Sequence, residues 1–262
     1  MMRGRVLKIS APRRLVGDLM RFSINIPRVT VQRHMNLAPL LNARAAQIKR
    51  PSWTVLFLKA YGVLCQEVPE LRRAYLMLPW PHLYEYSRSV ASVAHEREYQ
   101  GERVVLLETV KGPERRAIKE LQSMIEAARS KPVLEVRDFR RALKFARLPT
   151  PFRRSLLWLG LNIARRRARH FGTFQLSVYS GLGAESLNPL TPLTTLLNWG
   201  PIDEDGAVNV RILYDHRVMD GATVARALGR LEDILNTQIV SEVNDLARQA
   251  SSGPATAKRA LP

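Results

Sequence analysis

The sequence is nearly free of cysteine. Cys65 is the single cysteine among 262 residues, so neither an intrachain disulfide nor a thiolate metal cluster can form within one chain. A chain without disulfides suits a reducing compartment, and we therefore expect a cytoplasmic protein. Cys65 lies in the apolar helical pattern "FLKAYGVLCQEVPEL". In such a pattern a thiol packs as a small buried hydrophobe more often than it acts as a nucleophile.

Long apolar runs are also lacking. No stretch approaches the roughly 18 apolar residues that a membrane-spanning helix needs. The first residues, "MMRGRVLKIS", carry basic charge but not the apolar segment of a secretory signal peptide. We therefore expect neither a transmembrane helix nor a cleaved leader.

Acidic residues are scarce relative to basic ones. Lys and Arg number 41 against 23 Asp and Glu, which gives a formal net charge of +18. This excess predicts attraction to an anionic partner such as nucleic acid, acidic lipid headgroups, a phosphorylated cofactor or an acidic carrier protein. Charge alone does not choose among these partners.

Strand and helix patterns alternate along the chain without a clear break between domains. The expected strands cover residues 28–36, 89–95, 103–110, 174–179, 194–200 and 207–214. The expected helices cover residues 37–48, 52–68, 113–130 and 221–236. This mixture predicts a two-layer α+β or α/β sandwich formed by a single domain. The last stretch, "SSGPATAKRALP" at 251–262, reads as a flexible tail.

The stretch "YDHRVMDGA" places a histidine and an aspartate four residues apart where a strand meets a helix. Imidazole side chains in general titrate near neutral pH, which suits a general base, so His216 is a candidate for that role; Asp220 is placed to cap the helix. Gly221 would let the backbone turn sharply there, while Asp215 has no assigned role. From spacing alone, a structural histidine and a simple helix cap explain the pattern equally well. A metal site is disfavoured, because none of the five histidines is paired at ligand spacing.

The same stretch resembles the catalytic signature of the dihydrolipoyl acyltransferase components of 2-oxoacid dehydrogenase complexes, which share the fold of chloramphenicol acetyltransferase. The short HxxxDG core is common to the wider superfamily, including peptide-synthetase condensation domains, but the longer string is more specific. "GTFQLSVYSGLG", "TPLTTLLNWGPI", "IPRVTVQRHMNLAPLLNAR", "VLFLKAYGVLCQEVPEL" and "RRLVGDLM" are similar to further family segments, in the family's order. The similarity covers most of residues 10–240.

The resemblance implies a single α/β domain over residues 1–250 with the chloramphenicol-acetyltransferase-like fold, a two-layer sandwich in which helices flank a mixed central sheet. It also implies a homotrimer and acyl transfer. It makes His216 the base that removes the acceptor's proton and Ser177 the hydroxyl that stabilises the oxyanion, with the two contributed by neighbouring subunits. It pairs Asp220 with Arg13 or Arg14, so that these residues support the site without touching substrate. Coenzyme A or acyl-CoA is the implied substrate, and no covalently bound cofactor is implied.

Two of the chain's departures from the family bear on its domain organisation and its partners. It has no lipoyl domain, no peripheral-subunit-binding domain and no Ala/Pro-rich linker, so we expect a catalytic domain alone. It also carries an insertion over about residues 133–170 with eleven Lys or Arg between Arg137 and Arg169. The apolar stretch "LLWLGLNIA" inside it suits a helix lying on an anionic membrane surface, which the charge density slightly favours, or a helix packed on its own trimer. The candidates for contact with a membrane or another anion are Arg153, Arg154, Trp158, Arg165, Arg166 and Arg167.

Three functions follow as hypotheses. The first is an acyltransferase that moves an acyl group from a thioester, acyl-CoA above all, to a thiol, hydroxyl or amine. The second is a non-catalytic trimeric scaffold or a module that binds the inner surface of a membrane. The third is a transferase that takes its acyl group from an acidic acyl-carrier protein. Nucleic acid is a poorer partner, because few aromatics interleave with the arginines and no nucleic-acid motif is present.

Overall fold

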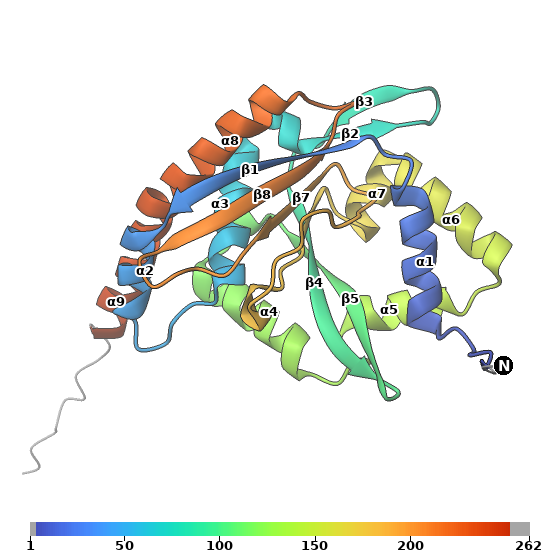
Figure 1. The fold of residues 1–262 in the computed structure, drawn as a ribbon, viewed down its shortest axis with the longest axis horizontal. Helices are drawn as coiled ribbons and strands as arrows, with labels where there is room; N and C mark the ends of the chain where they lie inside the picture. The colour runs from blue at the N-terminus through green and yellow to red at the C-terminus, as the bar shows by residue number, and fades with distance from the viewer. Residues whose placement is uncertain (1–3, 252–262) are drawn as a thin grey trace, which may run out of the picture.

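A computed structural model describes residues 4–251, and it shows a mixed sheet of six strands with helices packed against it (Figure 1). The strand order is β1-β8-β7-β6-β4-β5, in which β6 runs parallel to β4 and β7 and the other neighbours are antiparallel. These strands are β1 Arg28–Asn36, β4 Val90–Tyr99, β5 Glu102–Lys111, β6 Phe174–Leu176, β7 Thr195–Trp199 and β8 Ala207–Asp215. The predicted α/β sandwich is confirmed. Of the tail expected at 251–262, Ser251 is the last residue of α9, and 252–262 lie outside the described residues.

Helices from distant parts of the sequence cover the sheet. They are α1 Ala11–Ser23, α2 Ala38–Ala45, α3 Trp53–Glu67, α4 Ile118–Ser130, α5 Arg137–Ala146, α6 Thr150–Asn162, α7 Ala164–His170, α8 Gly221–Ile234 and α9 Val240–Ser251. In Figure 1, α2, α8 and α9 lie at the left, while α1, α5, α6 and α7 gather at the right beyond β4 and β5. The insertion therefore forms one end of the molecule.

The main core lies between α3, α8 and the sheet. Phe57 on α3 stacks on Trp199 of β7 with ring centroids 4.0 Å apart, and Tyr61 one turn later packs on Phe174 of β6 at 4.7 Å. The Tyr61 hydroxyl, buried in this core, lies 3.0 Å from the Thr195 hydroxyl, so its polar atom has a partner. Each predicted apolar helix face is buried, as expected for amphipathic helices over a sheet. These faces consist of Ile118, Leu121, Ile125 and Ala128 on α4, and Val224, Leu228, Leu231 and Leu235 at and just beyond α8.

The apolar helix of the insertion packs on its own chain. Helix α6 buries Leu157 and Leu161, and Gly160 approaches Phe171 so closely that a Cβ there would lie 2.9 Å from the ring. The outer side of α6 stays partly exposed, with Trp158 at 40%. No described helix is both long and apolar enough to cross a bilayer.

A short hairpin was not expected from the sequence. Strands β2 Arg73–Leu76 and β3 His82–Glu85 pair antiparallel beside the main sheet. Ala74 and Leu76 of this hairpin form a small apolar cluster with Tyr86 and with Ala164 and Ala168 of α7. The hairpin is thus one wall against which the end of the insertion packs.

Candidate active site

His216 is held at the point where β8 ends and α8 is about to begin. The Asp215 amide donates to the Thr194 carbonyl at 2.9 Å, and the His216 amide donates to the Pro27 carbonyl at 2.9 Å. Its backbone is therefore fixed from two sides, while the imidazole is about half exposed at 48%. An accessible imidazole on a rigid backbone is the arrangement that proton transfer to a bound substrate requires.

Asp220 occupies the N-cap position of α8, as predicted, but its carboxylate makes no capping hydrogen bond. The side chain is 84% exposed, and Oδ1 lies 3.8 Å from His216 Nδ1. This distance is too long for a hydrogen bond, although it allows an ion pair once the imidazole is protonated. Burial raises the pKa of the neighbouring Tyr214 hydroxyl, and the Asp220 carboxylate raises it further.

Gly221 supports the site for a reason other than the one predicted. Among the described residues, the positive-φ glycines do not include it, so no special backbone turn requires a glycine here. A Cβ at this position would instead lie 3.2 Å from the Tyr214 hydroxyl. The glycine leaves room for a large, buried side chain beside His216.

Asp215, which had no role in the sequence analysis, anchors the turn that follows β8. Its buried carboxylate accepts two hydrogen bonds from the Arg217 guanidinium, at 2.9 and 2.7 Å, and one from the Arg217 amide at 3.1 Å. The same guanidinium lies over the Tyr75 ring, 4.4 Å from its centroid. A bidentate pair of this kind fixes geometry as well as charge. Asp215 therefore shapes the backbone on either side of His216.

The predicted pairing of Asp220 with Arg13 or Arg14 is wrong in this chain. Arg13 pairs instead with Glu102 at 3.3 Å, and Arg14 forms no ion pair among the described residues. Helix α1 packs on α5 and β5, which keeps its arginines away from the start of α8. Its Asp18 lies between Arg153 Nε at 2.5 Å and Arg154 Nε at 2.8 Å, so α1 is tied to the insertion.

Ser177 follows β6 directly, because the strand ends at Leu176 rather than running to residue 179. Its amide continues the ladder to the Leu197 carbonyl at 3.3 Å, and the residue is buried. Leu176 of β6 pairs with Leu197 of β7, and Leu197 pairs with Ile212 of β8. Because β7 and β8 are antiparallel, Ser177, one residue after Leu176, lies level with Arg211, one residue before Ile212. His216 lies five residues beyond Arg211, or about 16 Å along the strand at about 3.3 Å per residue. One chain therefore places the serine and the histidine far apart.

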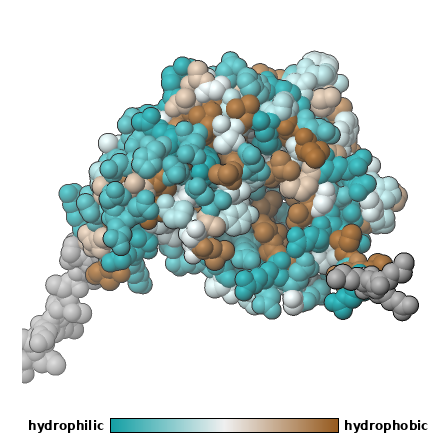
Figure 2. All heavy atoms as spheres, in the orientation of Figure 1, coloured by the Kyte–Doolittle hydropathy of each residue, from teal (hydrophilic) through white to brown (hydrophobic). Residues whose placement is uncertain are grey.

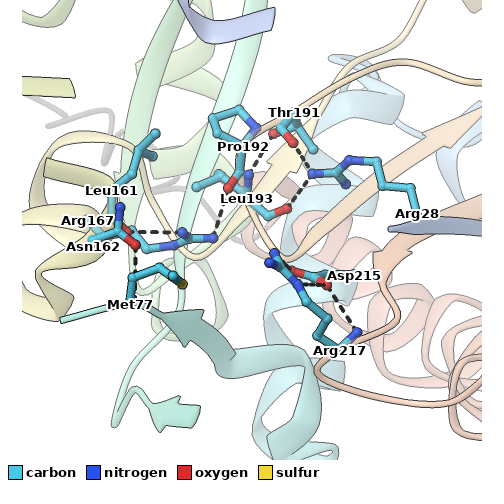
Figure 3. A network of polar contacts seen from close by, with 10 residues as sticks. All are labelled: Arg28, Met77, Leu161, Asn162, Arg167, Thr191, Pro192, Leu193, Asp215 and Arg217. Carbon is cyan, nitrogen blue, oxygen red and sulfur yellow. Dashed lines mark hydrogen bonds and ion pairs between the residues drawn. The ribbon is translucent and has the colours of Figure 1, made fainter. Parts of the chain in front are cut away.

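A network of arginines holds the loop before β7 against the site (Figure 3). Arg28 Nη2 donates to the Leu193 carbonyl at 2.9 Å and to the Thr191 carbonyl. Arg167 Nη2 donates to the Pro192 carbonyl at 2.9 Å. Burial lowers the pKa of Arg28 to about 10 against the opposing effect of the Asp215 carboxylate. Burial likewise lowers the pKa of Arg167.

Three of the arginines predicted to contact an external anion are buried or paired within the chain. Arg153 and Arg167 are buried, the first against Asp18 and the second against main-chain carbonyls, so neither can reach a membrane. Arg154 is partly exposed but pairs with Asp18. Arg165 and Arg166 are exposed, as a contact with an external anion would require.

Comparison with solved structures shows which known proteins share the fold that carries this site. No protein-family model matches the sequence, and no curated protein matches it. Among solved structures, the chain is similar to the dihydrolipoamide acetyltransferase of Azotobacter vinelandii, with 17% identity, a TM-score of 0.66, and coverage of 90% of this chain and 93% of that one. In that enzyme a serine, a histidine and an asparagine four positions after the histidine were investigated for their roles in catalysis.

Two further structures agree. The truncated catalytic core of the 2-oxoacid dehydrogenase complex from Thermoplasma acidophilum has 17% identity and a TM-score of 0.63, with coverage of 89% of this chain and 99% of that one. A chloramphenicol acetyltransferase has 15% identity and a TM-score of 0.50, with coverage of 88% and 99%. The chain thus has the fold shared by the catalytic core of dihydrolipoamide acetyltransferases and by chloramphenicol acetyltransferase.

Proposed function

We propose that the protein is an acyltransferase that uses His216 as its general base. The observation that carries this proposal is an accessible imidazole held by main-chain bonds at a strand-to-helix junction, in an acetyltransferase fold, with a carboxylate four residues later. The Azotobacter enzyme has a histidine and an asparagine at the same spacing. Asp220 takes the asparagine's place here and faces the imidazole.

The proposed reaction transfers an acyl group from a thioester to a thiol, hydroxyl or amine. His216 removes the acceptor's proton, and the acceptor atom attacks the thioester carbonyl. The Ser177 hydroxyl donates a hydrogen bond to the oxyanion of the tetrahedral intermediate. The carbon–sulfur bond then breaks, and the departing thiolate takes the proton from the imidazolium. No acyl-enzyme forms, and no metal or bound cofactor takes part.

We further propose that this site forms between subunits of a homo-oligomer. Within one chain Ser177 is level with Arg211, in the middle of β8, while His216 lies beyond the C-terminal end of that strand, so they cannot both touch one carbonyl group. A neighbouring copy that presents its Ser177 to His216 would complete the site. One solved structure with this fold is the cubic core of a pyruvate dehydrogenase complex, which supports assembly of several copies.

The proposal is tested by the release of free thiol from a panel of acyl-CoA donors and thiol, hydroxyl and amine acceptors. We expect His216→Ala to lower the rate about 10²–10⁴-fold, and Ser177→Ala about 10²–10³-fold. His34→Ala is the control, because this exposed imidazole lies on β1 and its one hydrogen bond within the described chain is to Asn209. Equal thiol release by the wild type and by His216→Ala would contradict catalysis by His216. The remaining hypothesis would then be a non-catalytic scaffold with this fold.

The donor is identified by comparing equal acyl chains on coenzyme A and on an acyl-carrier protein. The net charge of +18 suits both the phosphates of coenzyme A and an acidic carrier protein. We expect coenzyme A thioesters to be used directly. If only the acyl group bound to the carrier protein is transferred, the donor is the acyl-carrier protein and not acyl-CoA.

A further inference from the structure

The insertion encloses a cavity at the end of the molecule where α1 lies. It has a volume of about 510 Å³ and is bounded by α1, β5, α5, α6 and the end of α7. Small-molecule sites typically occupy roughly 300–1,000 Å³. The walls are mostly apolar, with contributions from Leu15, Leu19, Val105, Phe145, Leu156 and Phe171. Figure 2 shows hydrophobic residues set among a mostly hydrophilic surface on this face of the protein.

Two apolar side chains at this cavity are exposed to solvent. Val105 on β5 and Leu156 on α6 are 43% and 45% exposed. They come from elements far apart in the sequence, yet both line the same concave surface. Apolar side chains left in contact with water around a cavity lose that contact when an apolar ligand enters.

Four cations line the same cavity without acidic partners. Arg141, Lys144, Arg166 and Arg169 form no ion pair within residues 4–251. Asp138 is the acid at the cavity, and its carboxylate already accepts hydrogen bonds from the Thr109 amide at 2.9 Å and the Thr109 hydroxyl at 2.6 Å. The cations therefore give the cavity a positive potential that its own residues do not neutralise.

The pKa of the nearby His170 imidazole is lowered by burial and by three of the same cationic side chains. Burial lowers the pKa of His170, and the guanidiniums of Arg141 and Arg169 lower it further, with a smaller opposing effect from Asp138. The fixed charges of the arginines and the lysine remain as the attraction for an anion.

We propose that this cavity binds a molecule with a single aliphatic chain and an anionic head group, such as a fatty acid or a long-chain acyl-CoA. The apolar walls would cover the chain, and the unpaired cations would contact the carboxylate or phosphate. A concave cavity fits one inserted chain better than it fits the flat face of a bilayer. This proposal stands apart from catalysis at His216, since binding can be measured without turnover.

The test is calorimetric titration with saturated fatty acids of eight to fourteen carbons, kept below their critical micelle concentrations. We expect saturable binding that tightens about fourfold with each methylene until the cavity is filled. Acyl-CoAs of the same chain lengths form the second arm, and tighter binding there would identify the acyl donor as the ligand. Fatty alcohols of equal length, which lack the charge, should bind about tenfold more weakly.

Matched variants separate the cavity from general effects. Leu156→Glu should abolish binding, whereas Leu134→Glu should not, because Leu134 is equally exposed at 49% but lies outside the cavity. Lys144→Glu should weaken acid binding about tenfold and leave alcohol binding unchanged, with the exposed and remote Lys49→Glu as its control. Thermal unfolding verifies that each variant is folded.

Several results would overturn the proposal. One is binding that does not depend on chain length, and another is equal binding of acids and alcohols. A third is sedimentation with anionic vesicles by a protein that binds no single-chain ligand, which would identify a membrane surface instead. In a fourth, the wild type binds no ligand and Leu156→Glu changes the oligomeric mass. That result would show that a second copy of the chain covers the cavity.

Discussion

Replacing Asp18 with asparagine tests the contact that ties α1 to the insertion. The buried carboxylate lies between Arg153 Nε at 2.5 Å and Arg154 Nε at 2.8 Å, and Arg153 is itself buried. Removing one partner of a buried ion pair typically costs about 3–5 kcal/mol, because the other charge is left unpaired. In the variant Arg153 would still donate to the Leu148 carbonyl, which lies 2.7 Å from its Nη1. Because the guanidinium keeps this acceptor, we expect a cost at the lower end of that range.

For a domain of this size, a loss of about 3 kcal/mol lowers the midpoint of thermal unfolding by about 6–12 °C. The effect should depend on pH. Burial would raise the pKa of Asp18, but hydrogen bonds and charge from Arg154 and Arg153 outweigh it, so the pKa is lowered in the folded protein. Stabilisation by this carboxylate is therefore complete above its unfolded pKa of about 3.9 and is lost as the pH falls through the folded value.

The assay is thermal unfolding of wild type and Asp18→Asn at pH 7 and at pH 3. Glu102→Gln is the control, because its exposed pair with Arg13 should contribute no more than about 1 kcal/mol. Asp18→Leu combined with Arg153→Met should recover most of the lost stability, since apolar residues can replace a buried pair. A shift below about 1 °C at pH 7, or an equal shift at both pH values, would refute the reasoning.

Three more predictions concern other parts of the fold. Arg167→Met should speed proteolysis of the loop at 183–194, because it removes the hydrogen bond to the Pro192 carbonyl; unchanged cleavage would contradict this. Gly172→Ala should cost about 2–4 kcal/mol in denaturant unfolding, since its φ is +98° and a Cβ would lie 2.8 Å from a carbonyl oxygen; Gly181→Ala, with open space around it, is the control. Cys65 should resist iodoacetamide until the protein unfolds, because burial raises the pKa of its thiol; rapid labelling of the native protein would contradict this.

The regular parts of the fold could be predicted from the sequence because their periodicity is local. The strand at 28–36 and the buried faces of α4 and α8 appear as expected. The hairpin of β2 and β3 was missed because strands of four residues are too short to show a period. The longer strand predicted at 174–179 ends at Leu176, where the ladder to β7 gives way to the loop.

Contacts between distant residues were much harder to predict. Eleven basic residues in the insertion suggested a solvated or membrane-facing surface. Two of them, Arg153 and Arg167, are buried because a carboxylate on α1 and main-chain carbonyls accept their hydrogen bonds. Nothing local in the sequence marks those acceptors. The same holds for Arg13, which pairs with Glu102 on β5 rather than with the acid at the start of α8.

The site itself was partly predictable. The spacing of His216 and Asp220 brings their side chains to 3.8 Å because both residues lie in the short turn between the end of β8 at Asp215 and the start of α8 at Gly221. Asp215 could have been recognised from the Arg two residues later, which forms a local bidentate pair. The separation of Ser177 from His216 depends on the register of three strands, which the sequence does not reveal.

The two-subunit site is tested most directly by mixing chains that carry His216→Ala with chains that carry Ser177→Ala. Each variant alone should retain at most about a hundredth of the wild-type rate. Where the two chains assemble at random in equal amounts, about one interface in four joins an intact His216 to an intact Ser177. The mixture should therefore recover about a quarter of the wild-type rate of thiol release. No recovery, in a mixture whose chains are shown by native mass spectrometry to have assembled together, would contradict a site shared between subunits.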